Sequence, residues 1–97
     1  MTAKHKLPLV LIEWEDSRQP SSPWRWLADM KAPDAVLCAS VGWLTHDTAL
    51  VKVLAANMGG VEDSESVQAC GIITIPTRCV IKMTLLDART RRQRRGV

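Results

Sequence analysis

The side chains that could carry out chemistry are few and widely spaced in this sequence. Cys38 and His46 are residue types that form a nucleophile and its general base. That pairing also needs an orienting third group and an oxyanion site, and the sequence supplies neither. His46 falls in a predicted turn, where we interpret it as a solvent-exposed histidine. We therefore expect no catalytic residues and a protein that is not an enzyme.

The three cysteines could form a zinc site together with a histidine. Cys38, Cys70 and Cys79 are separated by 32 and 9 positions, and no Cys-x-x-Cys pair is present. This spacing matches no zinc-ligand pattern, and an odd number of cysteines does not indicate a disulfide framework. We interpret the cysteines as reduced, buried thiols of an intracellular protein.

Acidic residues gather at two places without forming a metal-binding motif. Neither group has the spacing of an EF-hand loop or of paired carboxylates, so both are interpreted as solvated. The sequence therefore predicts no metal and no cofactor. The two groups are Glu13, Glu15 and Asp16, and Glu62, Asp63 and Glu65.

The C-terminal segment is strongly basic. Residues 87–97 carry a net charge of +4 and residues 1–86 carry −1, which together give the +3 of the chain. Guanidinium groups bind phosphates bidentately, and arginine-rich arms can fold on RNA, so this segment is a candidate for binding RNA or DNA. The other interpretation is a solubilising tail. The candidate residues are Arg89, Arg91, Arg92, Arg94 and Arg95.

Tryptophan supplies all of the aromatic content, because the four tryptophans are accompanied by no phenylalanine and no tyrosine. The core must therefore be largely aliphatic. Trp24 and Trp26 flank Arg25, and tryptophan and arginine are enriched in the hot spots of interfaces. The same two rings could instead cap one end of the domain as part of its core. The candidate partner-binding residues are Trp24, Arg25, Trp26 and Trp43.

The segments that position these residues favour short strands. Residues 7–14 are rich in β-preferring types and form the first predicted strand. Residues 23–30 follow a serine that can cap a helix and begin with proline, so they predict either a short helical turn or an ordered loop held by two tryptophans. Residues 35–45 form the second predicted strand, in which Gly42 indicates a bulge or the close approach of another backbone.

The second half of the chain continues this pattern. A turn at residues 46–49 leads into a third strand that ends at Asn57, with Lys52 predicted to point outward. Residues 57–65 contain two glycines and three acids, which predict a flexible loop. Two further strands follow within residues 67–86 and are separated by the Ile-Pro-Thr-Arg segment.

These elements predict one domain of mainly β class. Five short strands and one short helical turn indicate a small SH3-like barrel or a curled antiparallel sheet over residues 7–86. Residues 1–6 are predicted to be a flexible N-terminus, and residues 87–97 a disordered tail, because neither segment has an apolar face to bury. The apolar run after Lys6 is too short for a signal sequence or a membrane span.

Two resemblances follow from these strands. Residues 71–86, GIITIPTRCVIKMTLL, resemble the end of SH3-like barrels, where a strand leads through an Ile-Pro turn of 3₁₀ type into a final strand. Over residues 9–86, the early Trp-acid strand, the SVGWL segment and the Ile-Pro, Arg-Cys-Val and Lys pattern resemble small uncharacterised proteins encoded by bacteriophages and prophages. The second resemblance implies an accessory phage role and assigns no catalytic residue.

We therefore expect a non-catalytic phage-type accessory protein that binds a host protein or a small ligand, with a counter-defence role as one form of this activity. The alternative is a nucleic-acid-binding protein that uses its arginine-rich C-terminal arm. Both would act in the cytoplasm of the bacterial host cell and not on a membrane. Apolar residues on both faces of residues 36–44 also predict that a second copy covers part of the surface, as in a homodimer.

Overall fold

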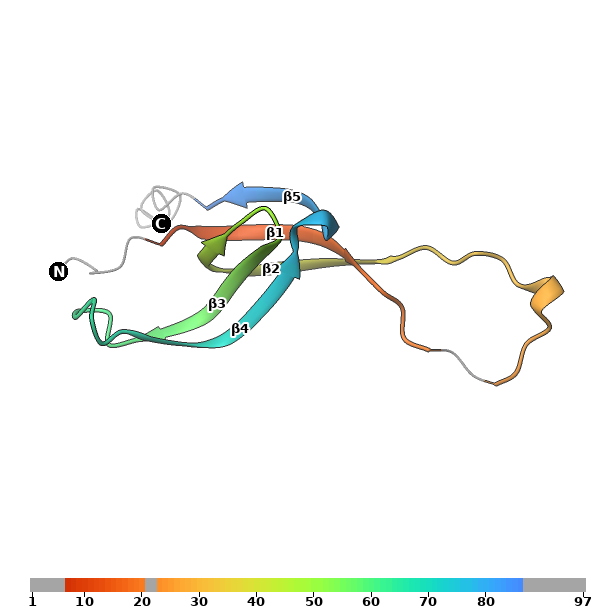
Figure 1. Cartoon of the computed structure of the whole chain (residues 1–97), viewed down its shortest axis with the longest axis horizontal. Helices are drawn as coiled ribbons and strands as arrows, with labels where there is room; N and C mark the ends of the chain where they lie inside the picture. Colours follow the sequence, from red (N-terminus) through yellow and green to blue (C-terminus); the bar gives the residue numbers. More distant parts are fainter. Residues whose placement is uncertain (1–6, 21–22, 87–97) are drawn as a thin grey trace, which may run out of the picture.

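Five antiparallel strands in a single sheet make up the domain (Figure 1). The computed structural model describes residues 7–20 and 23–86. The predicted N-terminal segment 1–6 and the predicted tail 87–97 lie outside this part. The elements in chain order are β1 (Leu9–Asp16), the 3₁₀ turn η1 (Leu27–Asp29), β2 (Val36–Asp47), β3 (Val51–Gly59), β4 (Gln68–Pro76), the 3₁₀ turn η2 (Thr77–Cys79) and β5 (Val80–Leu85).

The strand order in the sheet is β4-β3-β2-β1-β5, and every neighbouring pair is antiparallel. The mainly β class and the five predicted strands are confirmed. Of the two predicted architectures, the curled sheet is correct and the closed barrel is wrong, because β4 and β5 remain the two edges of one open sheet. Two short 3₁₀ turns are present among the described residues where one helical turn was predicted.

A small aliphatic core lies on one face of the sheet. Alternate residues of β1 point into it, so that Val10 and Ile12 are 2% and 0% exposed. The other fully enclosed core side chains come from β2, β3 and β4, and the half-buried Trp14 packs against them. These buried core residues are Val10, Ile12, Leu44, Leu54 and Ile75.

Gly42 allows β2 and β3 to approach each other closely beside this core. A Cβ atom placed on Gly42 would lie 2.8 Å from the carbonyl oxygen of Ala55 and 3.1 Å from the Cβ of Leu54. Real Cβ atoms do not approach a carbonyl oxygen so closely, so a larger residue would push the strands apart. The predicted close approach of another backbone at Gly42 is confirmed.

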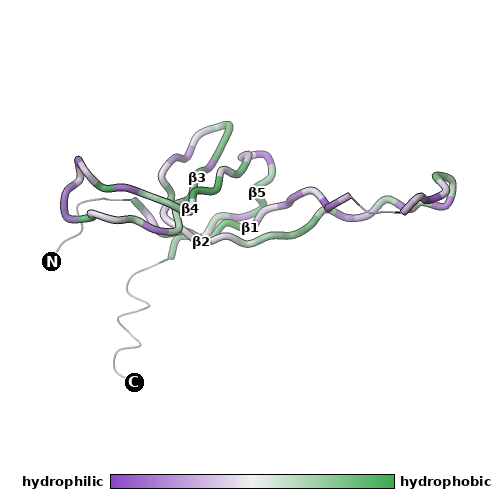
Figure 2. The backbone as a smooth tube through the Cα atoms, turned by 90° about the horizontal axis from the view of Figure 1, so that it is seen from below, coloured by the Kyte–Doolittle hydropathy of each residue, from purple (hydrophilic) through white to green (hydrophobic). Residues whose placement is uncertain are grey.

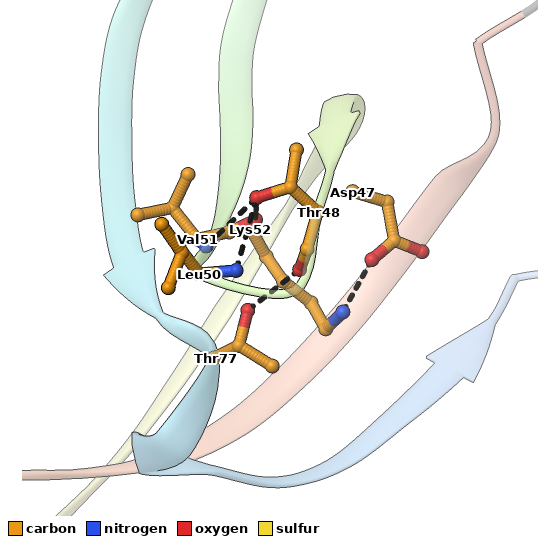
Figure 3. Close-up of polar contacts among 6 residues, drawn as sticks. All are labelled: Asp47, Thr48, Leu50, Val51, Lys52 and Thr77. Atoms are coloured by element: carbon orange, nitrogen blue, oxygen red, sulfur yellow. Dashed lines mark hydrogen bonds and ion pairs between the residues drawn. The ribbon is translucent and has the colours of Figure 1, made fainter.

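The predicted outward orientation of Lys52 is wrong. Lys52 lies directly opposite the fully buried Ile75 in the β3–β4 register, so the two side chains share the core face. Its aliphatic stem lies against the sheet while its ammonium group forms an ion pair with the carboxylate of Asp47 (Figure 3). Lys52 is two residues from the buried Leu54 on β3, so strand alternation places both side chains on the core face. The prediction took the charge of Lys52 as a sign of exposure.

Candidate functional site

A long arm joins β1 to β2. Strand pairing ends with Asp16 opposite Val36. Of the 19 residues between them, the described ones, 17–20 and 23–35, form two limbs that extend away from the sheet (Figure 1). Every described residue from Glu15 to Ala35 is exposed. The radius of gyration is 18.5 Å, whereas a compact domain of this size would have a value of about 12 Å.

Local sequence explains why the arm pairs with no other strand. Pro20, Pro23 and Pro33 interrupt it, and proline lacks the amide that a strand or a helix interior needs. The helical turn predicted over residues 23–30 is reduced to η1, which begins after Trp26 and has no side-chain cap. The two limbs of the arm are linked near the sheet, where the guanidinium of Arg18 donates to the carbonyl oxygen of Asp34.

Large apolar side chains gather at the end of the arm. Trp24 is 100% exposed, Trp26 82%, Leu27 83% and Met30 50%. Figure 2 shows hydrophobic colour at the far end of the arm, where η1 lies. We call Trp24, Trp26, Leu27 and Met30 the apolar tip.

The apolar tip decides between the two interpretations of the paired tryptophans. Trp24 and Trp26 lie on the surface and not in the core. Their neighbour Arg25 lines an open hollow of about 510 Å³ together with Trp26, Asp29, Met30 and Lys31. The side chains of the tip are thus accompanied by two cations and one acid.

Trp43 does not belong to the apolar tip. It lies in β2, half-buried, opposite Leu9 of β1 and Ala55 of β3. The structure therefore brings together three of the four predicted partner-binding residues and leaves Trp43 on the sheet. Sequence reasoning missed Leu27 and Met30 as members of the tip. Their position among prolines, without a periodic apolar face, is the signal that could have identified them.

The predicted nucleophile and base are far apart. Cys38 and His46 are eight residues apart on the same strand, β2, which at about 3.3 Å per residue separates them by roughly 25 Å. His46 is exposed, as predicted, although it lies in the last residues of β2 and not in the turn. Its Nδ1 is 3.0 Å from the hydroxyl oxygen of Thr45.

The cysteines occur as free thiols, but the prediction that they are buried is wrong. Cys70 is exposed, and Cys38 and Cys79 are half-buried. Cys70 lies on β4 opposite Asn57 of β3, which is also exposed, in the part of these two strands that extends beyond the buried core residues Leu54 and Ile75. No group of three or more histidine, cysteine or acidic side chains that could hold a metal ion occurs among residues 7–20 and 23–86.

The remaining predicted sites are distributed as follows. Glu13 is half-buried opposite Lys82 of β5, whereas the other acids named from the sequence are exposed. The five candidate arginines, Arg89, Arg91, Arg92, Arg94 and Arg95, lie outside the described residues. Within the described part of the chain, no helix has the length and apolar character needed to cross a membrane.

Comparison with known proteins gives no relative from which a function could be transferred. No family model, no curated protein and no solved structure matches this chain. The candidate site is therefore defined by its own geometry: an exposed apolar tip, carried on an extended arm at a distance from the core.

Proposed function

We propose that the chain is a non-catalytic binding protein that inserts the apolar tip of its arm into a groove of a partner protein. In the setting that its sequence resemblance suggests, it is a phage-type accessory protein and the partner is a host protein in the bacterial cytoplasm. The observation that carries this proposal is the exposure of Trp24, Trp26 and Leu27 at the end of the arm.

Burial of the apolar tip in a partner would be energetically favourable. Tryptophan and leucine side chains each gain about 1.5–3 kcal/mol or more when fully buried. In the isolated chain the side chains of the apolar tip stay in contact with water, because no described part of the fold covers them. The free energy of burying them is therefore not gained until a partner binds. Binding to a concave apolar surface would release it, and two tryptophans beside an arginine match the composition of interface hot spots.

The charged residues beside the apolar tip indicate which kind of partner surface it fits. Residues 23–31, which include the apolar tip, contain Arg25 and Lys31 but one acid, Asp29, so this segment carries a net charge of +1. A groove with an apolar floor and an acidic rim complements this arrangement. The extended limbs allow such a groove to be recessed from the surface of the partner.

The proposal is tested by photo-cross-linking and by affinity measurement. A photoreactive phenylalanine analogue placed at position 24 is expected to cross-link one protein in host extract. The same analogue at position 50 serves as the matched control, because Leu50 is 76% exposed but lies in the β2–β3 turn. The cross-linked protein is then purified and titrated with the chain.

For that purified protein, Trp24→Ser and Trp26→Ser are each expected to weaken binding by about 30-fold or more, which corresponds to the 2 kcal/mol of a hot-spot residue. Leu50→Ser is expected to leave the affinity unchanged. Equal cross-linking from positions 24 and 50 would contradict the proposal. So would unchanged affinity after both tryptophan substitutions, or binding of the tip to nucleic acid or lipid vesicles and to no protein.

A further inference from the structure

The core face of the sheet extends beyond the part of the sheet that covers it. In the β1–β5 register, Val10 lies opposite Leu85 and Ile12 opposite Met83, so these four side chains share one face. Val10 and Ile12 are 2% and 0% exposed, whereas Met83 and Leu85 are 38% and 66% exposed. A closed barrel would cover the last two residues with another strand, and this open sheet does not.

No strand among the described residues pairs with the outer side of β5. The amide of Leu86 donates to the carbonyl oxygen of Leu9, which lies opposite it in register, at 2.9 Å. Because hydrogen-bonded pairs alternate in an antiparallel ladder, the amide and carbonyl groups of Thr84 face β1, and those of Met83 and Leu85 face outward. Figure 1 shows β5 along the upper margin of the sheet.

The two edges of the sheet differ in their protection against further pairing. β4 contains Gly71, whose φ of 69° departs from extended geometry, and it ends at Pro76. Glycine kinks and proline are devices by which edge strands avoid pairing. β5 has neither; its register shift against β1, between Val80 and Lys82, and its single charged residue, Lys82, lie in its N-terminal half. The C-terminal half of β5, Met83 to Leu85, is therefore the part of the two edges that is open to a neighbouring strand.

We infer that this neighbour is a second copy of the same chain, bound through its own β5 about a twofold axis. The two β5 strands run antiparallel and join the two sheets into one of ten strands. Met83 lies opposite Met83 of the second copy, and Ile81 lies opposite Leu85 of the second copy. The Met83 and Leu85 side chains of both copies then cover one another over the open end of the core.

The outward-facing amides of β5 and the position of Lys82 determine which residues of the two β5 strands lie opposite one another. Outward-facing amides can meet only if residues of odd number, such as Met83 and Leu85, pair with each other. A twofold axis at Met83 satisfies this condition and places Lys82 opposite Thr84 of the second copy. An axis at Lys82 would place two like charges directly opposite one another, which is unfavourable. An axis at Thr84 would pair only residues 83–85 of the two β5 strands, whereas the axis at Met83 pairs residues 81–85. The β5 strand is thus self-complementary, as a twofold interface requires.

Proline substitution gives a selective test of this interface. Met83→Pro removes an amide that faces the open edge and none that bonds to β1, so the fold is expected to survive. Leu85→Lys places a charge in the same interface without altering the backbone. The matched control is Ile72→Lys, since Ile72 is 52% exposed on the other edge strand, β4.

The mass in solution is measured by light scattering over a concentration series, with circular dichroism to verify folding. The wild type and Ile72→Lys are expected at twice the 10.8 kDa of the chain, and Met83→Pro and Leu85→Lys at the mass of one chain. Amide hydrogen exchange is expected to show protection of Met83 and Leu85 that increases with protein concentration in the wild type alone.

Three results would overturn the inference. The first is a monomeric wild type at 100 µM or above. The second is a dimer that persists in both folded β5 variants or is lost in Ile72→Lys. The third is protection of Met83 that does not depend on concentration, which would assign the cover of β5 to the same chain. Because these variants leave the arm intact, they do not test the apolar tip, and the two proposals can fail separately.

Discussion

The hydroxyl of Thr77 donates a hydrogen bond of 2.9 Å to the carbonyl oxygen of Thr48, which lies 29 residues earlier in the chain. The amide of Thr77 also donates to the carbonyl oxygen of Leu50 at 3.0 Å. These two bonds, of which Figure 3 draws the first, fasten η2 to the turn between β2 and β3. Because β5 begins directly after η2, they also set the position from which β5 returns to pair with β1.

Loss of the Thr77 hydroxyl is expected to destabilise the domain. Thr77→Val keeps the shape of the side chain but leaves the Thr48 carbonyl without this donor, at a cost of about 1 kcal/mol in the free energy of unfolding. Urea denaturation followed by circular dichroism measures this difference. Thr77→Ser retains the hydroxyl and should lose markedly less stability. Equal losses in the two variants would show that the methyl group, and not the hydrogen bond, matters.

Gly42 is expected to tolerate no side chain. Gly42→Ala places a methyl group against the carbonyl oxygen of Ala55, and forcing the two strands apart should cost about 1–3 kcal/mol. Gly59→Ala is the matched control, because nothing lies within 4 Å of a Cβ at that position. Thermal unfolding of both variants makes the comparison, and a Gly42→Ala variant as stable as Gly59→Ala would refute the close approach.

The indole of Trp14 depends on a single serine for its hydrogen bond. Trp14 Nε1 donates to Ser40 Oγ at 3.1 Å in a partly buried site between β1 and β2. Ser40→Ala should therefore cost about 1–2 kcal/mol, since the indole N–H keeps its desolvation without its acceptor. Faster hydrogen exchange of the Trp14 indole, seen by NMR, is the specific readout. Ser66→Ala, in the exposed β3–β4 loop, should change neither quantity.

The arm is expected to be dispensable for folding. The amide of Leu44 donates to the carbonyl oxygen of Pro8, so alternation makes Asp16 and Val36 a hydrogen-bonded pair as well. An Asn-Gly turn closes such a pair, and it can replace residues 17–35 directly.

The shorter loop should leave the free energy of unfolding unchanged or raise it by up to about 2 kcal/mol through its smaller closure entropy. The shortened chain should also fail to bind the partner of the apolar tip. Denaturant unfolding measures the first effect. A stability loss of more than about 1 kcal/mol would mean that the arm packs on the domain.

Much of the strand layout could be predicted from the sequence because it depends on local patterns. Alternation gave β1 to within two residues, and the Ile-Pro segment correctly separated β4 from β5. The orientation of Lys52 was predicted wrongly because its charge was taken as a sign of exposure, although it lies two residues from the buried Leu54 on β3. The fold accommodates the charge on the core face through Asp47, which lies opposite Lys52 on β2 and forms an ion pair with it.

The candidate site could also be predicted only in part from the sequence. The sequence identified Trp24, Arg25 and Trp26 as one group, but it could not say whether the two rings were buried. Burial depends on whether other parts of the chain reach the segment, and that is a property of the whole fold. Trp43 was added to the group on residue type alone, and the structure separates it from the tip.

The sequence by itself determined a mainly β domain with a small aliphatic core, since residue types and their alternation fix which segments can form strands. The tertiary structure alone decided that the sheet stays open, that β5 leaves part of the core face uncovered, and that the apolar tip projects from the domain. These features depend on strand order and on distances between segments remote in sequence, to which local residue preferences contribute little.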